Sequence, residues 1–510
     1  MKLYTLNYKT TFSTILLVFA LFCPIILMGS MVGLPSIAHT SQNLIISKQE
    51  VNTGYILEWN RTYGTTFHDY GNGLCVDNNN NVYLVGNVYN TSQSAYDAFI
   101  IKYDWSGAQL LEINYDFNGL GDGGNDVAVD SSGNIFLTGY TEDGSVGGTS
   151  QDSILIKYNS LGVKQPSWHI GSTYGDSGNA VETDASDNIY MVGHLGTASD
   201  GSDLMLRKYD SAFTHDWGVS IGGGSNDVGN DVTIDSNGDV YVVGYTESWG
   251  AGGSDILIAK YNSLGTKQWN DTFGWTSSEE GKGIVIDTDQ CIVASNTAVF
   301  YGSTYTDITF ARIWKNTGTT PGWAHFRGSS EDFAYGIDKD SNGDFLLCGS
   351  TYSYGEGNYD AIVIKYNSSY SYMYNFTFGT SSYDNTRGIA LDGNDNIYIA
   401  GSTQGFGAGN SDAYLAKFGI DEDNDGLTHD QEVYTYFTNP CDADHDNDGY
   451  TDGAEVDAGT NPLDPNDYPG ATTTTEIPGF DLITVLITLM GVIGLLTLTF
   501  KLKAQQKIKF

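Results

Sequence analysis

Two short acidic stretches carry the residue pattern with the clearest chemistry in this 510-residue sequence. Each follows the order Asp-x-[Asp/Asn]-x-[Asp/Asn]-Gly-x5-Glu without a gap, the first from Asp421 and the second from Asp444. Alternate carboxylates can wrap one cation, the glycine permits the sharp turn, and the glutamate can close the shell with both oxygens. Because Ca²⁺ takes six to eight hard oxygen ligands, the pattern predicts Ca²⁺ as the cofactor of residues 421–467.

The spacing assigns the ligands of the two loops. The predicted side-chain ligands are Asp421, Asp423, Asp425 and Glu432 in the first loop and Asp444, Asp446, Asp448 and Glu455 in the second, with the backbone carbonyls of Leu427 and Tyr450 at position seven. Asp452 stands at position nine of the second loop, where the first has His429 and a water could serve. Residues 421–467 hold 15 Asp+Glu and no Lys or Arg, so a metal-free acidic linker is the alternative.

These two loops do not predict an ordinary pair of EF-hands. Only 11 residues separate Glu432 from Asp444, too few for an exiting and an entering helix. A Thr-Asn-Pro triplet follows each loop, at 438–440 and 460–462. With these triplets the segment resembles the thrombospondin type-3 and dockerin-like calcium repeats, and the resemblance implies the same ligands.

A second, much longer repeat precedes this segment in the sequence. An aspartate that ends one short strand recurs at intervals of 51 to 54 residues, and about twenty residues later a second aspartate opens another strand with a cation five positions on. The first series is Asp77, Asp130, Asp184, Asp235, Asp287, Asp340 and Asp392; the second is Asp97, Asp152, Asp203, Asp255, Asp307, Asp360 and Asp412. Each unit holds about four short strands and no helical period.

Seven units of four strands predict an all-β, seven-bladed β-propeller over residues 55–420, because stacked blades bury the faces that one sheet leaves open. The last unit lacks its fourth strand, and residues 55–63 supply a spare one before the first unit. We therefore expect this N-terminal strand to complete the last blade and close the ring. The repeats resemble the seven-bladed β-propeller repeat proteins of bacterial and archaeal surfaces, a family that implies no single function.

Features shared by all blades are expected to serve the fold. The Asp-x-Asn-Gly-Asp turns at Asp235 and Asp340 imitate half of a calcium loop, but repeated Asx-turns are the favoured interpretation. In the second series the aspartate and the cation five positions later lie on opposite faces of their strand, so they cannot pair with each other. We expect these cations to contact turns or neighbouring blades.

One partial repeat is a candidate binding site. Six residues before the second aspartate, blades four to seven carry the aromatic residues Trp249, Tyr301, Tyr354 and Phe406. Loops at equivalent positions emerge on one face of a propeller, so these rings would form an aromatic arc beside acidic loops. Such an arc suits an extracellular glycan or a protein ligand. The alternative is that the rings only cover blade edges.

The two ends predict export and membrane attachment. Residues 1–38 read as a signal peptide, with an uncleaved anchor as the alternative, and residues 480–500 read as a transmembrane segment after a Thr-rich spacer at 468–479. The lysines of the tail, 501–510, place it in the cytoplasm and the bulk of the chain outside. The Pro478-Gly479-Phe480 order resembles the C-terminal sorting signals of archaeal surface proteins, which implies that the tail is cut and replaced by a lipid.

Charge and composition narrow the function. The net charge of −39 argues against a nucleic-acid partner, and five scattered cysteines do not make a disulfide scaffold. Five glycosylation triplets, at Asn60, Asn90, Asn270, Asn367 and Asn375, are compatible with an exported glycoprotein. No nucleophile elbow, phosphate loop or zinc triad is present in the sequence. We expect a non-catalytic, surface-anchored binding or adhesion protein on a calcium-stiffened stalk. A passive envelope component and a propeller-type carbohydrate-active enzyme are the alternatives.

Overall fold

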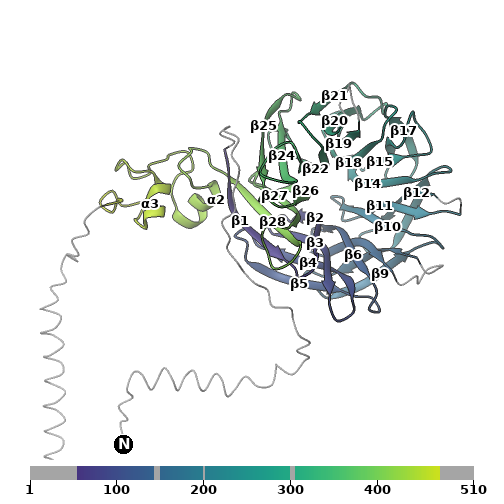
Figure 1. The fold of residues 1–510 in the computed structure, drawn as a ribbon, viewed down its shortest axis with the longest axis horizontal. Coiled ribbons are helices and arrows are strands. Elements are labelled where there is room, and N and C mark those ends of the chain that lie inside the picture. The colour runs from purple at the N-terminus through teal and green to yellow at the C-terminus, as the bar shows by residue number, and fades with distance from the viewer. Residues whose placement is uncertain (1–53, 143–149, 199–200, 299–304, 471–510) are drawn as a thin grey trace, which may run out of the picture. The chain divides into compact units, whose positions relative to one another are not determined.

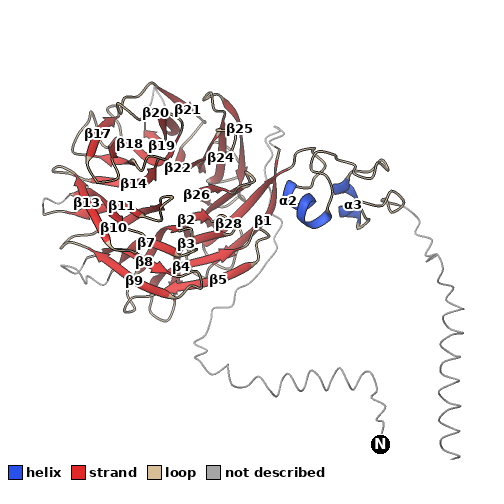
Figure 2. Cartoon of the chain, turned by 180° about the vertical axis from the view of Figure 1, so that it is seen from behind, coloured by secondary structure: helices blue, strands red, loops and turns tan. Residues whose placement is uncertain are grey.

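The computed structural model describes residues 54–142, 150–198, 201–298 and 305–470 (Figure 1). They form two compact units: the propeller, which includes residues 57–418, and the acidic module, which includes residues 54–56 and 419–470. Figure 2 shows the helices among these residues only in the acidic module, whereas strands build the propeller.

The propeller consists of seven four-stranded antiparallel sheets, as the sequence predicts. Blade 1 is β2 Tyr70–Val76, β3 Val82–Asn90, β4 Ala95–Tyr103 and β5 Gln109–Tyr115; blade 2 is β6 Asp122–Val129, β7 Ile135–Thr141, β8 Asp152–Tyr158 and β9 Lys164–Ile170; blade 3 is β10 Ser177–Thr183, β11 Ile189–Gly196, β12 Ser202–Tyr209 and β13 His215–Ile221. Blade 4 is β14 Asp227–Ile234, β15 Val240–Thr246, β16 Asp255–Tyr261 and β17 Lys267–Phe273; blade 5 is β18 Glu279–Ile286, β19 Gln290–Ala298, β20 Thr306–Trp314 and β21 Gly322–Phe326. Blade 6 is β22 Asp332–Lys339, β23 Phe345–Thr351, β24 Asp360–Tyr366 and β25 Tyr372–Phe378.

Blade 7 confirms the predicted closure. It is built from β26 Asp384–Leu391, β27 Ile397–Thr403, β28 Asp412–Ile420 and the N-terminal strand β1 Tyr55–Tyr63, in the order β1-β28-β27-β26. Trp59 of β1 is buried, and its indole Nε1 donates to the carbonyl of Trp105 in the neighbouring blade at 3.0 Å. The buried Lys417 of β28 lies 2.9 Å from the carboxylate of Glu58. Closure therefore gives β28 a hydrogen-bonded partner where an open edge would otherwise remain.

The hydrophobic core lies between blades. One buried cluster joins Leu84 and Phe99 of blade 1 with Tyr398 and Leu415 of blade 7, and the other clusters likewise combine residues of adjacent blades. Inner strands such as β27 are buried on both faces for this reason.

The first aspartate series forms Asx-turns, as expected. In six of the seven units the Oδ1 of this aspartate accepts the backbone N–H groups two and four residues later, at Asp77, Asp130, Asp184, Asp235, Asp340 and Asp392. The repeated cation reaches the same turn from β4 and β24, where Lys102 lies 3.3 Å from Asp77 and Lys365 lies 2.7 Å from Asp340. These acids thus hold turns together.

The central channel of the propeller is a cavity of about 440 Å³. Polar side chains around it form hydrogen bonds between adjacent blades. Each of four asparagines donates to a backbone carbonyl of the next blade at 2.7 to 2.8 Å; they are Asn72, Asn125, Asn179 and Asn230. Asp126, Asp231 and Asp338 accept backbone N–H groups of the next blade at 2.8 to 2.9 Å. The channel acids therefore serve the joints between blades.

The acidic module has only short helical turns: α2 His429–Gln431, the π-turn η1 Glu432–Tyr436 and α3 Asp452–Ala458. Thr428 forms a capping box with Gln431, and the side chain of Thr451 caps α3. No long helix flanks either loop among the described residues, which agrees with the expectation that this is not an ordinary EF-hand pair.

The predicted membrane-associated segments fall in the first and last parts of the chain. No helix of the described residues is long and apolar enough to cross a membrane. The predicted signal at 1–38, the span at 480–500, the tail at 501–510 and residues 471–479 of the Thr-rich spacer lie outside the described residues.

Candidate metal centre

The first loop brings its three aspartates together. Asp421, Asp423 and Asp425 each offer a carboxylate oxygen within 4.8 Å of the others. The backbone bends around them at Asn424 and Gly426, with φ of 63° and 101°, and the left-handed value at Gly426 explains the glycine of the motif. The backbone N–H of Leu427 donates to Asp425 Oδ1 at 2.7 Å and fixes the curl.

The glutamate that ends the first loop is fully buried with one oxygen unsatisfied. Glu432 Oε1 accepts from the hydroxyl of Thr438 at 3.3 Å, whereas Oε2 has no hydrogen-bond partner among the described residues. Asp421 Oδ1 is also buried and has no hydrogen-bond partner among the described residues. Burial, followed by the charges of Asp423 and Asp425, raises the pKa of Glu432 to about 8. A bound cation would satisfy these oxygens.

The second loop repeats this arrangement 23 residues later. Asp444, Asp446 and Asp448 converge within 4.8 Å, and the N–H of Gly449 donates to Asp444 Oδ2 at 2.9 Å. Glu455 is fully buried, and its Oε2 has no partner among the described residues. Burial is the main cause that raises the pKa of Glu455 to about 7, followed by the charges of Asp446 and Asp448. As in the first loop, a threonine of a Thr-Asn-Pro triplet approaches the glutamate: the hydroxyl of Thr460 lies 3.5 Å from Glu455 Oε1. These triplets therefore position the glutamates.

Asp452 lies between the two loops, a placement that its position in the second loop does not reveal. It is fully buried, its Oδ1 accepts the N–H of His445 at 3.0 Å, and its Oδ2 has no partner among the described residues. Burial raises the pKa of Asp452, and the charges of Asp425 and Asp444, one from each loop, raise it further. The N–H of Gly453 also donates to Asp425 Oδ2 at 2.8 Å, so the start of α3 packs against the first loop.

The donor set fits Ca²⁺. All the predicted side-chain ligands are carboxylates, without the nitrogen or sulfur donors that zinc prefers. The side chain of Leu427 is buried, and Tyr450 stacks on Tyr468 with ring centroids 5.7 Å apart, which holds the backbone at position seven of each loop. Ligation by the two carbonyls stays a prediction.

The predicted aromatic arc does not form a continuous exposed surface among the described residues. Trp249 is 42% exposed, but Phe406 is buried against Phe378 and Tyr414, so the prediction of an exposed ring is wrong at this position. Tyr354 is half-buried against Phe326, and its hydroxyl donates to the carbonyl of Arg327 at 3.0 Å. Tyr301 lies outside the described residues. At Tyr354 and Phe406 the rings cover blade edges, as the alternative held.

A different group of rings gathers at the junction of blades 6 and 7. Phe333, Tyr352 and Tyr383 have ring centroids 6.0, 5.3 and 5.4 Å from that of Tyr359. The hydroxyl of Tyr359 donates to Glu331 at 2.6 Å, and Tyr352 is 48% exposed. We call these four residues the aromatic cluster. A sequence signal existed, because three of the rings stand directly beside a strand-opening aspartate, but no spacing along the chain shows that they meet.

Comparisons with known proteins agree with both units. Residues 216–248 and 378–407 match the model of the Beta-propeller repeat, and residues 444–465 match that of the Bacterial TSP3 repeat. The chain carries both kinds of repeat. The TSP3 match covers the second acidic loop, a predicted calcium site, and its Thr-Asn-Pro triplet.

More distant similarities concern the propeller. An uncharacterized WD repeat-containing protein of Acanthamoeba polyphaga mimivirus is 23% identical over 311 residues, which is 50% of this chain and 20% of that protein. The β-propeller domain of the Trilobed protease from Pyrococcus furiosus is 9% identical, with a TM-score of 0.43 over 68% of this chain and 93% of that one. A PL25 ulvan lyase is 12% identical, with a TM-score of 0.44 over 70% and 95%. The fold assignment rests on the seven sheets of this chain itself.

Proposed function

We propose that this chain is a non-catalytic binding protein of the cell surface, with a propeller head that carries the ligand site and an acidic module that Ca²⁺ makes rigid. The predicted signal peptide and C-terminal segment support export and attachment. The net charge of −39 supports a neutral glycan or a basic protein surface as ligand, because an anionic partner would be repelled.

The observation that carries the proposal is the aromatic cluster. Four contacting rings with one half-exposed edge and an adjacent carboxylate give an apolar platform beside a hydrogen-bond acceptor. Aromatic platforms with a few fixed polar groups are typical of ligand sites, and rings that already contact one another lose little entropy when a ligand arrives.

Substitution within the cluster tests this proposal. The Tyr352→Ala/Tyr359→Ala chain and the unmodified chain would be screened against neutral glycans and envelope proteins with calcium present. We expect the double variant to lose at least about tenfold in affinity, or about 1.4 kcal/mol. Tyr372→Ala is the matched control, because Tyr372 is 50% exposed on β25 and outside the cluster.

Two results would overturn the proposal. Equal binding by the double variant and the unmodified chain would show that the aromatic cluster is not the ligand site. Release of soluble products from a bound glycan would replace binding with catalysis.

A further inference from the structure

Paired acids occupy the blade junctions of the propeller. The aspartate near the start of the third strand lies close to the acid at the start of the next blade in four blades: Asp97 and Asp122, Asp255 and Glu279, Asp360 and Asp384, and Asp412 and Asp69. A close glycine shows the arrangement. A Cβ on Gly274 would lie 1.9 Å from Asp255 Oδ1 and 2.7 Å from Glu279 Oε2, so the backbone of this glycine packs against both acids.

Blade 1 departs from this pattern at one position. The last residue of the fourth strand pairs with the residue after the junction aspartate, as in Tyr115 with Ala98 and Phe273 with Ile256, and the register therefore aligns Asp116 with Gly274. The same position holds Gly64, Gly171, Gly222, Arg327 and Gly379 in the other blades. Among the described residues, only the junction of blades 1 and 2 has a third carboxylate at this aligned position.

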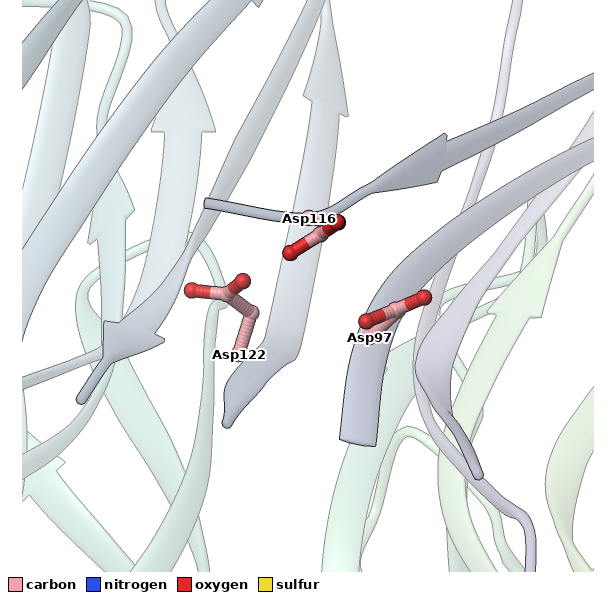
Figure 3. A group of neighbouring side chains, drawn as sticks. All are labelled: Asp97, Asp116 and Asp122. Atoms are coloured by element: carbon pink, nitrogen blue, oxygen red, sulfur yellow. The ribbon is translucent and has the colours of Figure 1, made fainter. Parts of the chain in front are cut away.

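The three carboxylates converge. Asp97 from β4, Asp116 from the loop after β5 and Asp122 from the start of β6 offer oxygens within 4.8 Å of one another (Figure 3). Asp122 is fully buried and Asp97 is 6% exposed, whereas Asp116 is exposed. Asp97 Oδ1 is buried and has no hydrogen-bond partner among the described residues, so a buried acceptor at this junction lacks a donor.

Four of the other oxygens are held in place by hydrogen bonds, whereas Asp122 Oδ1, like Asp97 Oδ1, is buried without a partner among the described residues. Asn90 Nδ2 donates to Asp97 Oδ2 at 2.8 Å, and the N–H of Phe117 donates to Asp122 Oδ2 at 2.6 Å. Asp116 accepts from Gln93 Nε2 at 2.7 Å and from the N–H of Gly119 at 2.8 Å. None of the three acids forms an ion pair with a Lys or Arg of the described residues. Three carboxylates this close repel one another unless a cation lies among them.

We propose that Asp97, Asp116 and Asp122 bind a further Ca²⁺ ion that ties blade 1 to blade 2, apart from the two ions of the acidic module. The donor set consists of carboxylate oxygens, and the exposed Asp116 side leaves room for the waters that complete a calcium shell. The ion would supply the partner that Asp97 Oδ1 lacks. It would also add a link between two sheets that the N–H of Phe117 already joins through its hydrogen bond to Asp122.

Asp116→Gly tests this site, because it restores the residue that five other blades carry. Bound calcium would be counted on the full chain by equilibrium dialysis at about millimolar free Ca²⁺, the range of weak extracellular sites. We expect Asp116→Gly and Asp116→Asn each to bind one ion fewer than the unmodified chain. Asp104→Asn is the control, since Asp104 closes an Asx-turn at the opposite end of β4.

Thermal unfolding supplies a second readout that does not depend on the module. Calcium should raise the melting temperature of the propeller in the unmodified chain and in Asp104→Asn, but not in Asp116→Asn. An unchanged ion count in both Asp116 variants would overturn the site. An equal loss in Asp104→Asn would do so as well, because it would show only a general response to charge.

Discussion

The Asx-turns of the propeller and the predicted calcium loops of the acidic module use the same residue types in different surroundings. In the turn at Asp235, Oδ1 accepts two backbone N–H groups, while Oδ2 accepts from the hydroxyl of Tyr241 and lies 2.9 Å from Lys315. In the second loop, Asp446 Oδ2 and Asp448 Oδ2 are buried without a partner among the described residues. The difference shows that the supply of protein donors, more than the local motif, separates a turn from a metal site.

The source of this difference is the surrounding sequence. In six of the seven propeller turns a neighbouring strand or turn brings a cation or a tyrosine hydroxyl to the acid, as Lys102 and Tyr83 do at Asp77. Residues 421–467 contain no Lys or Arg, so no permanently charged cation of the segment meets their carboxylates, and His429 lies 3.2 Å from Glu422, which is not one of the predicted ligands. A cation from solution is then the partner that removes the repulsion among them.

The largest expected effect is at Glu432. Glu432→Gln replaces a bidentate carboxylate by an amide and should weaken calcium binding at the first loop on the order of a hundredfold, or about 2.7 kcal/mol. Isothermal titration calorimetry would show weakened binding at the first loop, with binding at the second loop and at the proposed propeller site unchanged. Loss of both sites together would mean that the two loops fold as one cooperative unit, and unchanged affinity would contradict the ligand assignment.

A smaller effect is expected at the threonine that holds this glutamate. Thr438→Val keeps the side-chain shape but removes the hydroxyl that donates to Glu432 Oε1. Loss of a group that orients a metal ligand typically lowers affinity by a factor of about 10 to 100, and we expect the lower end for this long hydrogen bond. Thr435→Val is the control, because Thr435 is exposed in the same turn. Equal calcium titrations for the two variants would refute a positioning role for Thr438.

The acids of the central channel differ from both the Asx-turn acids and the loop acids. They accept hydrogen bonds from the backbone, but they are poorly solvated. Burial raises the pKa of Asp231 to about 7, although both its oxygens accept backbone N–H groups. The unfolded pKa is about 3.9, so the folded state binds more protons and stability should fall as the pH rises from about 4 to about 7.

Asp231→Asn should remove this part of the pH dependence. Asp231 has some contact with solvent in the channel. The loss of unfolding free energy that depends on Asp231 should therefore be about 1 kcal/mol between pH 4.5 and pH 7.5. Chemical unfolding at pH 4.5 and pH 7.5 measures it, and a variant with the same slope as the unmodified chain would contradict the assignment.

The smallest effect is expected in an Asx-turn. Asp104 accepts the N–H groups of Ser106 and Ala108 at Oδ1, and asparagine can accept the same two bonds. Asp104→Asn should change the unfolding free energy by about 0.5 kcal/mol or less and leave calcium binding unchanged. A fall in bound calcium would break the distinction between turns and loops.

The sequence predicted the fold well because the repeat supplies seven independent copies of each strand and turn. It also predicted the closing strand at residues 55–63, since blade 7 lacked a fourth strand of its own. The sequence could not show that Asp452 lies between the loops or that Asp116 meets Asp97 and Asp122, because these contacts join separate repeats. It misjudged Phe406 because periodic placement reports the position of a ring along a blade and does not report its burial.

The central claim is that calcium orders the acidic module while the propeller keeps its fold through protein contacts. Limited proteolysis of the full chain, with and without a chelator and followed by mass spectrometry of the cut sites, tests it most directly. Chelation should open new proteolytic cuts between residues 420 and 470 and leave the propeller resistant to the protease. Equal resistance of residues 420–470 under both conditions would contradict it.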